Sequence, residues 1–346
     1  MIRRAGILVA AFVAAGYAAP NEGSVSPITL RAAAERRGLL VGAATMSGTL
    51  KDLRHAETLA REFNLVTPEN EMKWAFIRPT RQTWNFAGAD RLVAFAEKHK
   101  LAIHGHNLLW YAHNPPWLTA MPWTPAQTQQ LMTEHIGTVV GRYRGKIAIW
   151  DVVNEEINEQ GLLRKSLWSR AGTNYLSLAF RTAHEADPKA HLVYNDYGIE
   201  EVNRKSDGAY ALLKSLKAQG APVHGVGFQC HVEGNGPDLE SFARNLQRFA
   251  DLGLDLHLTE IDVRIKVPAT PQDYARQARV YRGLIATALK NPRTKSVTTW
   301  GHSDAHSWVP SFFKGFGDAL PFDARYQPKP AYEAMRQAMM ESAPRH

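Results

Sequence analysis

Two glutamates in this chain end segments that are typical of buried strands. Residues 147–156, IAIWDVVNEE, run through β-branched residues and stop at an asparagine followed by Glu155 and Glu156. Residues 254–262, LDLHLTEID, place Glu260 in a similar way. Two carboxyl groups that flank a glycosidic bond can hydrolyse it, because one protonates the leaving oxygen while the other acts from the opposite face of the sugar. Glu155 is the better candidate of its pair because it is continuous with the strand, so Glu156 is expected to be a loop bystander.

Other polar and aromatic side chains collect at the same kind of position. Almost every strand-like segment ends on groups that can hydrogen-bond, titrate or stack, which are Glu69 and Asn70, His104 and His106, Asn154 and Glu155, Asn195 and Asp196, Gln229 and His231, Glu260 and Asp262, and Trp300 and Asp304. The segments after the strands also carry Trp74, Trp110, Trp117, Trp123, Trp300 and Trp308. Rings that stack on sugar faces, beside amides and carboxylates that bind hydroxyls, favour a carbohydrate site. Trp117 and Trp123 fit a core position equally well.

The strand-like segments alternate with helix-like ones. The apolar runs cover residues 39–45, 63–70, 101–108, 147–155, 191–197, 223–231, 254–262 and 296–304. Helical spacing follows in residues 89–100, 124–143, 270–291 and 329–343, and Thr-Pro pairs at 124 and 270 are typical helix starts. Strands that are apolar on both faces and are each followed by a helix predict an α/β fold, a single-domain (β/α)8 TIM barrel. A doubly wound open sheet is the alternative, but VGAATMSG lacks the GxGxxG spacing of its first turn.

The N-terminus has the three regions of a secretory signal. MIRR is positively charged, AGILVAAFVAAG is apolar, and YAAP ends in small residues. We expect residues 1–19 to be a signal peptide that is cleaved near Ala18 or Ala19, and residues 24–346 to form the catalytic barrel. The mature protein would then be secreted or periplasmic. No later stretch reaches transmembrane length, so no membrane association is expected after cleavage.

Composition argues against several other classes of protein. The formal charge is +8, but the excess is spread along the chain without a basic block or a recognised motif, so no nucleic-acid partner is expected. The only cysteine, Cys230, permits no intrachain disulfide. Its apolar neighbours predict a buried side chain rather than a reactive thiol. A monomer is expected.

Six motifs in combination resemble glycoside hydrolase family 10, the retaining endo-β-1,4-xylanases. They are TPENEMKW at 67–74, WDVVNE at 150–155, YNDYG at 194–198, GFQCH at 227–231, LTEIDVR at 258–264 and TTWGHSDAHSW at 298–308. The similarity runs from about Leu39 through YQPKPAY at 326–332. It implies a barrel enzyme that hydrolyses internal β-1,4-xylosidic bonds of xylan and xylo-oligosaccharides. The implied reaction is a double displacement through a covalent glycosyl-enzyme, with no cofactor and no metal.

The resemblance also implies roles for individual residues. Glu155 would be the general acid/base and Glu260 the nucleophile. His231 would hold Glu260, and Asp262 would orient His231. Asn154 would bind the sugar 2-hydroxyl. The remaining substrate-binding residues would be Glu69, Asn70, Lys73, His106, Trp110 and Gln229 on the glycone side, Trp300 and Trp308 as walls, and Tyr197 on the aglycone side.

Two stretches depart from the family pattern. The third-strand motif usually reads His-Thr-Leu-Val-Trp-His, whereas this chain has HNLLWY, with Asn107 and Tyr111 at the differing positions. The eighth-strand loop has His302 where an apolar residue is more common. At these three positions the resemblance therefore implies nothing about aglycone contacts, pH profile or subsite preference. The two carboxylates are untouched.

Three other functions fit part of the sequence. The HGH motif at 104–106, with His302 and His306, would suit a metal-dependent barrel hydrolase. A carbohydrate-binding barrel without catalysis would keep the tryptophans but would not need Glu155 and Glu260 together. Another retaining β-glycosidase, acting on cellulose or short oligosaccharides, would share the whole site. Bulk at Trp300 could exclude the C6 hydroxymethyl of glucose, a discrimination of about tenfold.

Overall fold

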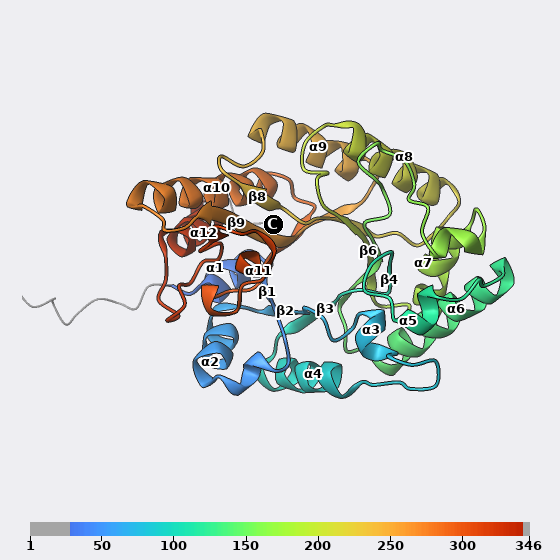
Figure 1. The fold of residues 1–346 in the computed structure, drawn as a ribbon. Coiled ribbons are helices and arrows are strands. Elements are labelled where there is room, and N and C mark those ends of the chain that lie inside the picture. The colour runs from blue at the N-terminus through green and yellow to red at the C-terminus, as the bar shows by residue number, and fades with distance from the viewer. Residues whose placement is uncertain (1–27, 342–346) are drawn as a thin grey trace, which may run out of the picture.

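The chain forms a closed barrel of parallel strands surrounded by helices (Figure 1). The structure is a computed structural model and describes residues 28–341, so the predicted signal peptide and its cleavage site lie outside the described residues. Eight strands follow the order β10-β1-β2-β3-β5-β6-β7-β9, and β10 also pairs with β9, which closes the ring. The prediction of a single-domain (β/α)8 TIM barrel is therefore confirmed.

Each barrel strand overlaps one of the predicted apolar segments. The strands are β1 Leu40–Thr45, β2 Leu65–Pro68, β3 Ala102–Gly105, β5 Ile149–Asn154, β6 His191–Asp196, β7 Gly225–Phe228, β9 Asp255–Lys266 and β10 Thr294–Thr299. Three short strands lie outside the ring, namely β4 Leu109–Trp110, β8 His231–Glu233 and β11 Phe316–Gly317. β9 extends beyond its predicted end because its second half pairs with β8 and β11. Glu260 therefore lies inside β9 rather than at its end.

Helices connect the strands and cover the outside of the barrel. They are α1 Leu30–Glu35, α2 Leu53–Glu62, α4 Ala87–His99, α6 Pro125–Arg142, α7 Tyr175–Ala186, α8 Arg204–Ala218, α9 Leu239–Asp251, α10 Pro271–Leu289 and α12 Pro330–Glu341. Helices α6 and α10 start where the Thr-Pro pairs predict. The hydroxyls of Thr124 and Thr270 each accept a hydrogen bond from the backbone N–H of the third helical residue, which satisfies a group that the helix itself cannot.

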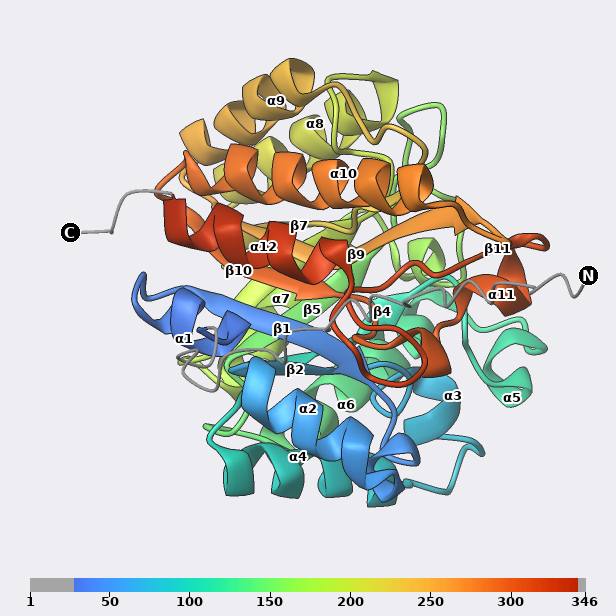
Figure 2. The same ribbon diagram turned by 90° about the vertical axis from the view of Figure 1, so that its left-hand side faces the viewer.

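The loops that follow the strands gather at one end of the barrel. Figure 2 shows the short helices α3 (Trp74–Ile77), α5 (Pro116–Thr119) and α11 (Val309–Phe312) together on its right-hand side. The other short elements are the 3-10 turns η1 Thr49–Lys51, η2 Trp168–Ala171 and η3 Asp304–His306. In barrels of this class the carboxyl ends of the strands carry the active site, because loops from every strand converge there.

The core consists of apolar strand residues packed against the covering helices. Val41, Val152 and Leu256 are examples of fully buried strand residues. Cys230 is also buried, which confirms the prediction for its side chain. Among residues 28–341, no helix combines the length and the apolar character that crossing a membrane would require.

Three of the loop tryptophans serve the core and the loops themselves. Trp74 is buried and stacks on His135 with ring centroids 3.6 Å apart, so its prediction as a sugar-facing residue is wrong. The indole N–H groups of Trp117 and Trp123 donate to backbone carbonyls at 2.9 and 2.7 Å. Trp123 is buried in the core and Trp117 is partly buried against it, so the core interpretation holds for both residues.

Candidate active site

Glu155 is the first residue after β5 and is held by indole and amide N–H groups. Its Oε2 accepts a hydrogen bond from Trp110 Nε1 at 3.0 Å, and its Oε1 accepts one from Gln229 Nε2 at 2.9 Å. Its backbone has φ 58°, a left-handed conformation that is uncommon outside glycine and is concentrated at functional sites. Only 8% of the residue is exposed. The carboxyl group is therefore fixed in one direction at the mouth of the barrel.

Glu260 is bound by a histidine and an amide. Its Oε2 accepts a hydrogen bond from His231 Nε2 at 3.2 Å, and its Oε1 accepts one from Asn195 Nδ2 at 2.6 Å. Burial by itself would raise the pKa of the Glu260 carboxyl. The hydrogen bond and positive charge of His231 oppose burial and leave the pKa below its ordinary value. Glu260 is thus kept as a carboxylate, which is the form that a nucleophile requires.

His231 lies between two carboxylates. Its Nδ1 donates to Asp262 Oδ2 at 2.8 Å, and the same oxygen accepts a hydrogen bond from Trp308 Nε1 at 2.7 Å. Burial alone would lower the pKa of His231, but Asp262 and Glu260 raise it to about 10. The imidazole therefore carries a proton on both nitrogens and donates to both carboxylates.

A chain of amides connects the two glutamates. Asn195 Nδ2 donates to Asn154 Oδ1 at 2.9 Å as well as to Glu260, and Asn154 Nδ2 donates to Glu155 Oε1 at 3.3 Å. Thr259 Oγ1 donates to Asn195 Oδ1 at 2.7 Å, which fixes the orientation of that amide. The sequence marks Asn195 only as a polar strand end and predicts no role for it.

A glycine on the neighbouring strand makes room for Asn195. A Cβ atom at Gly227 would lie 2.3 Å from Asn195 Oδ1 and 2.8 Å from Thr259 Cγ2. Both distances are far inside van der Waals contact, so a larger residue would displace the amide. In the sequence, the glycine of the GFQCH motif could therefore have indicated that a side chain from β6 reaches across to β7.

Lys73, Glu69 and Asn70 lie together next to the tryptophans of the site. Lys73 Nζ donates to Asn70 Oδ1 at 3.0 Å and lies 5.2 Å from the ring centroid of Trp110 and 5.9 Å from that of Trp300. Burial lowers the pKa of the Lys73 ammonium, although nearby carboxylates counteract it. Burial raises the pKa of Glu69 to about 7, with Lys73 opposing the rise. A cation, a carboxyl group and an amide are thus available to the hydroxyls of a bound sugar.

Both histidines of the HGH motif bind one carboxylate. His104 Nε2 and His106 Nδ1 donate to the two oxygens of Asp151 at 2.8 and 2.9 Å. His106 Nε2 accepts a hydrogen bond from Asn107 Nδ2 at 3.1 Å, and its ring lies 5.1 Å from that of Trp300. Within residues 28–341, no group of three or more His, Cys, Asp or Glu side chains is arranged to hold a metal ion. The motif therefore builds a hydrogen-bond network under the site.

Tyr197 is linked to the backbone of Glu155 through Arg164. Its hydroxyl donates to Glu159 Oε1 at 2.7 Å and accepts a hydrogen bond from Arg164 Nη2 at 3.0 Å. Arg164 Nε also donates to the backbone carbonyl of Glu155 at 2.8 Å, a supporting contact that no sequence motif predicts. Lys205 Nζ lies 3.0 Å from the centroid of the Tyr197 ring. Because the lysine covers one face, a sugar could stack only on the other face.

His302 lies outside the site. It is fully buried, and its ring lies 4.2 Å from that of His55 and 5.8 Å from that of Phe63. Burial holds the pKa of His302 well below its ordinary value, so the ring is neutral and packs like the apolar residue that is more common there. The departure at His302 is therefore a change in core packing, where the ring lies against His55 and Phe63.

Glu156 is a buried structural residue, so its prediction as a loop bystander is wrong. Its side chain is fully buried. Oε1 accepts hydrogen bonds from Tyr175 Oη at 2.6 Å and from Ser166 Oγ at 3.0 Å. Burial raises the pKa of Glu156 to about 7 despite both bonds. The carboxyl group ties the loop after β5 to the start of α7.

Replacing Glu156 with glutamine should make stability depend less on pH. The pKa of Glu156 is about 7 in the folded chain against 4.5 for an exposed glutamate. The protonated carboxyl group therefore adds to the free energy of unfolding below the unfolded pKa. This contribution is lost once the pH has risen through the folded pKa. Between about pH 5 and about pH 8, the Tm of the wild type should fall about 2–3 °C further than that of Glu156→Gln. Calorimetry of both proteins at both pH values measures this difference. If the Tm of the wild type differed from that of Glu156→Gln by the same amount at the two pH values, a titrating Glu156 would be contradicted.

One end of the barrel thus brings together all of the residues that the resemblance implies. The residues linked to one another by the contacts above are Glu69, Asn70, Lys73, His106, Trp110, Asn154, Glu155, Tyr197, Gln229, His231, Glu260, Asp262, Trp300 and Trp308. The two glutamates have different partners, so one carboxyl group is held ionised beside a cation while the other faces neutral donors. Such a pair can combine nucleophilic attack with proton transfer.

Known proteins are similar to this chain in both sequence and fold. Residues 29–338 match Glycosyl hydrolase family 10. Endo-1,4-beta-xylanase B of Thermotoga neapolitana is 43% identical over 319 residues, which cover 91% of this chain and 92% of that protein. The native xylanase 10B of Thermotoga maritima has a TM-score of 0.88 at 44% identity, covering 90% of this chain and 98% of that one. Xylanase 10B of Thermotoga petrophila RKU-1, solved in complex with xylobiose, has a TM-score of 0.89 at 42% identity, covering 92% and 98%.

Proposed function

Because this chain belongs to glycosyl hydrolase family 10, we propose that it is a retaining endo-1,4-β-xylanase. Its substrates would be xylan and xylo-oligosaccharides, cut at internal β-1,4-xylosidic bonds. Glu260 would be the nucleophile and Glu155 the general acid/base. The enzyme would work as a monomer, and the double displacement by two carboxyl groups requires neither a metal nor a cofactor.

This proposal rests on the different surroundings of the two glutamates. Glu260 accepts a hydrogen bond from the protonated His231, and its pKa is lowered. Glu155 accepts hydrogen bonds from the uncharged donors Trp110 and Gln229. A carboxyl group that must stay ionised and one that must exchange a proton need different environments, and this pair has them.

In the first step, a carboxylate oxygen of Glu260 would attack C1 of the sugar. The new C1–O bond forms as the bond from C1 to the leaving oxygen breaks, and Glu155 gives its proton to that oxygen. The amide of Asn154 lies between the two carboxyl groups. From there it can bind the 2-hydroxyl of the reacting sugar, a contact that strengthens in the transition state of such reactions.

In the second step, water would replace the leaving sugar. Glu155, now a carboxylate, accepts a proton from the water as the water oxygen attacks C1 and releases Glu260. Each of the two attacks inverts C1, so the β configuration is retained. His231 and Asn195 keep Glu260 in place as a leaving group, since both bind its oxygens directly.

The relatives support xylan rather than cellulose as the substrate. Their printed names describe endo-1,4-beta-xylanases, and one solved relative holds xylobiose. In this chain, the ring of Trp300 lies beside His106 and Lys73, two residues expected on the glycone side, and is 8% exposed. This bulky ring therefore limits the space next to them. A sugar without the C6 hydroxymethyl group needs less room there.

Viscosity and reducing ends should be followed together on β-1,4-xylan and on carboxymethyl-cellulose. Cleavage inside a polymer lowers viscosity strongly for few new ends, so we expect rapid viscosity loss on xylan and little change on cellulose. Slow viscosity loss with many new ends would instead indicate an exo enzyme or one for short oligosaccharides. Loss on cellulose equal to that on xylan would contradict the proposed specificity.

We also propose that the mature enzyme is exported. The apolar segment between the arginines at positions 3 and 4 and the small residues near Ala18 and Ala19 supports this. N-terminal sequencing of the protein from culture medium and periplasm would identify both the cleavage site and the compartment. An intact N-terminus on cytoplasmic protein would contradict export.

A further inference from the structure

The turn between β8 and α9 contains Asn235 followed by Gly236, the only Asn-Gly pair in the sequence. The backbone nitrogen of the residue after an asparagine can attack the side-chain amide carbon of that asparagine. Glycine hinders this attack least, because it has no side chain and the most conformational freedom. Every other asparagine in the sequence precedes a residue with a side chain. The pair is therefore the position at which the chain has the least steric protection against deamidation.

The side-chain amide of Asn235 has no partner that fixes it. The residue is exposed, and its amide forms no hydrogen bond with residues 28–341. By contrast, hydrogen bonds to neighbouring side chains hold the amides of Asn154 and Asn195 in the active site. An exposed amide can change rotamer, so the amide carbon of Asn235 can approach the nitrogen of Gly236.

The fold requires glycine at position 236. Its φ is 70°, in the left-handed region that favours glycine. A Cβ atom there would also lie 2.7 Å from Val280 Cγ1 on α10, which is far inside van der Waals contact. A residue whose side chain would shield Asn235 therefore cannot replace Gly236 unless the turn moves away from α10.

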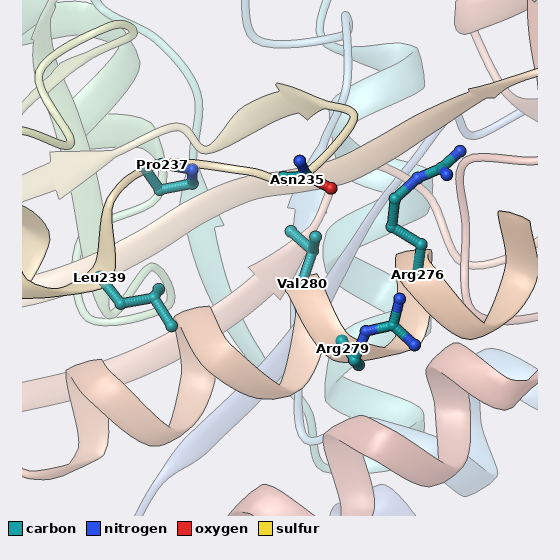
Figure 3. Close-up of a pocket in the computed structure, with 6 residues that line it drawn as sticks. All are labelled: Asn235, Pro237, Leu239, Arg276, Arg279 and Val280. Atoms are coloured by element: carbon teal, nitrogen blue, oxygen red, sulfur yellow. The ribbon is translucent and has the colours of Figure 1, made fainter.

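Two arginines share a hollow with Asn235. Figure 3 shows its lining residues, Asn235, Pro237, Leu239, Arg276, Arg279 and Val280, which surround about 250 Å³. Arg276 is paired with Asp273, but Arg279 is exposed and forms no ion pair with the described residues. Positive charge stabilises both the deprotonated nitrogen that attacks and the oxyanion that forms on the amide. The hollow therefore favours the reaction and also suits the carboxylate that the reaction yields.

One hydrogen bond opposes the reaction. The backbone N–H of Gly236 donates to the carbonyl of Glu233 at 3.1 Å and closes the turn. This N–H must leave the carbonyl before the nitrogen can attack, so the folded protein should react more slowly than an unfolded chain. A hydrogen bond in an exposed turn opens locally at little cost, because water replaces the lost partner.

We propose that Asn235 is a site of spontaneous deamidation in the folded protein, and that Arg279 accelerates the reaction. The Gly236 nitrogen loses its proton and forms a bond to Cγ of Asn235. The bond from Cγ to Nδ2 breaks, and Nδ2 takes up a proton and leaves as ammonia. Water then opens the cyclic imide at either carbonyl carbon, which gives aspartate or isoaspartate at position 235. This inference goes beyond the proposed function and does not depend on it.

Peptide mapping of the aged protein tests the assignment. The folded protein is kept at mildly alkaline pH and low salt, and its peptides are followed by mass spectrometry and by enzymatic methylation of isoaspartate. The Asn235 peptide should gain the mass of one deamidation before the peptide of any other asparagine does. Isoelectric focusing should show one additional, more acidic form. Asn235→Gln should remove both changes, because the longer side chain closes the ring far more slowly.

Charge variants test the role of the hollow. Arg279→Gln should lower the rate at Asn235 about two- to fivefold at low salt, and this difference should shrink as salt rises. Lys98→Gln is the matched control, because it removes an exposed cation from α4. Helix α4 lies across the barrel from α9 (Figures 1 and 2), so this variant should keep the wild-type rate.

Each contrary result overturns a stated part of the proposal. Modification of another asparagine at an equal or higher rate would overturn the assignment to Asn235. The same holds if the Asn235 peptide reacts in urea but stays intact in the folded protein, because the turn would then protect the pair. Equal rates for Arg279→Gln and Lys98→Gln would overturn the role of the hollow. None of these results depends on cleavage of xylan, which the viscosity measurements test separately.

Discussion

Replacing Glu260 with alanine is expected to abolish hydrolysis of every substrate, with kcat lowered by about 10⁴-fold or more. Without the carboxylate no covalent intermediate forms, and a better leaving group cannot compensate for the missing nucleophile. His231 and Asn195 lose the oxygens to which they donate, but neither can attack C1 in place of Glu260. Initial rates on xylan and on a series of aryl β-xylosides measure the loss.

Two controls distinguish a missing nucleophile from a damaged fold. Glu260→Gln keeps the volume of the side chain and an oxygen that can accept a hydrogen bond, yet it should be as inactive as the alanine variant. Added azide should restore turnover in Glu260→Ala and give an α-glycosyl azide, because azide enters from the face that the carboxylate has left. A β-glycosyl azide, or an aryl xyloside hydrolysed at more than about a hundredth of the wild-type rate, would refute Glu260 as the nucleophile.

Replacing Glu155 with alanine should give losses that depend on the leaving group. On xylan, whose leaving sugar needs a proton, the expected loss in kcat/KM is about 10²- to 10⁴-fold. Aryl xylosides with good leaving groups should retain most of their kcat/KM, because the first step needs no acid. Their kcat should still fall, since Glu155 is also absent as the base for water, and the glycosyl-enzyme should accumulate as a burst of released phenol.

Azide also tests the role of Glu155. In Glu155→Ala, azide attacks the accumulated glycosyl-enzyme from the β face and does not need a base, so it should raise kcat and give a β-glycosyl azide. Glu156→Gln is the matched control, because it changes the adjacent glutamate and should keep activity on both classes of substrate. Equal losses for Glu155→Ala on xylan and on activated aryl xylosides would refute the acid/base assignment.

The barrel could be predicted from the sequence because each of its strands is buried on both faces. A parallel strand that has helices on one side and the barrel interior on the other must be apolar throughout, so segments such as 147–155 stand out in the chain. The starts of α6 and α10 at Thr-Pro pairs could also be predicted, because each cap involves only residues three positions apart in the sequence. Glu155 follows from the same principle, because the residue after a parallel strand must lie at the active end of the barrel.

The error at Glu156 has a different origin. A glutamate just after a strand reads as a loop residue, because nothing within a few positions indicates what will cover it. Its partner Tyr175 is 19 residues further along the chain, and the space that buries it is formed by the β5–α7 loop and α7. The same holds for Trp74, whose stacking partner His135 comes from α6. Polarity and neighbouring sequence cannot predict contacts of this kind.

The sequence alone thus determined the barrel and the segments that place Glu155 and Glu260 on it, because these depend on the pattern of single strands. Only the tertiary structure decided how those glutamates differ. Asn195 reaches Glu260 across 65 positions, Gln229 reaches Glu155 across 74, and Arg164 comes back to the carbonyl of Glu155 from a loop. Hydrogen bonds, charges and burial act over a few ångströms in space, and strands that are distant in the chain become neighbours only when the barrel closes.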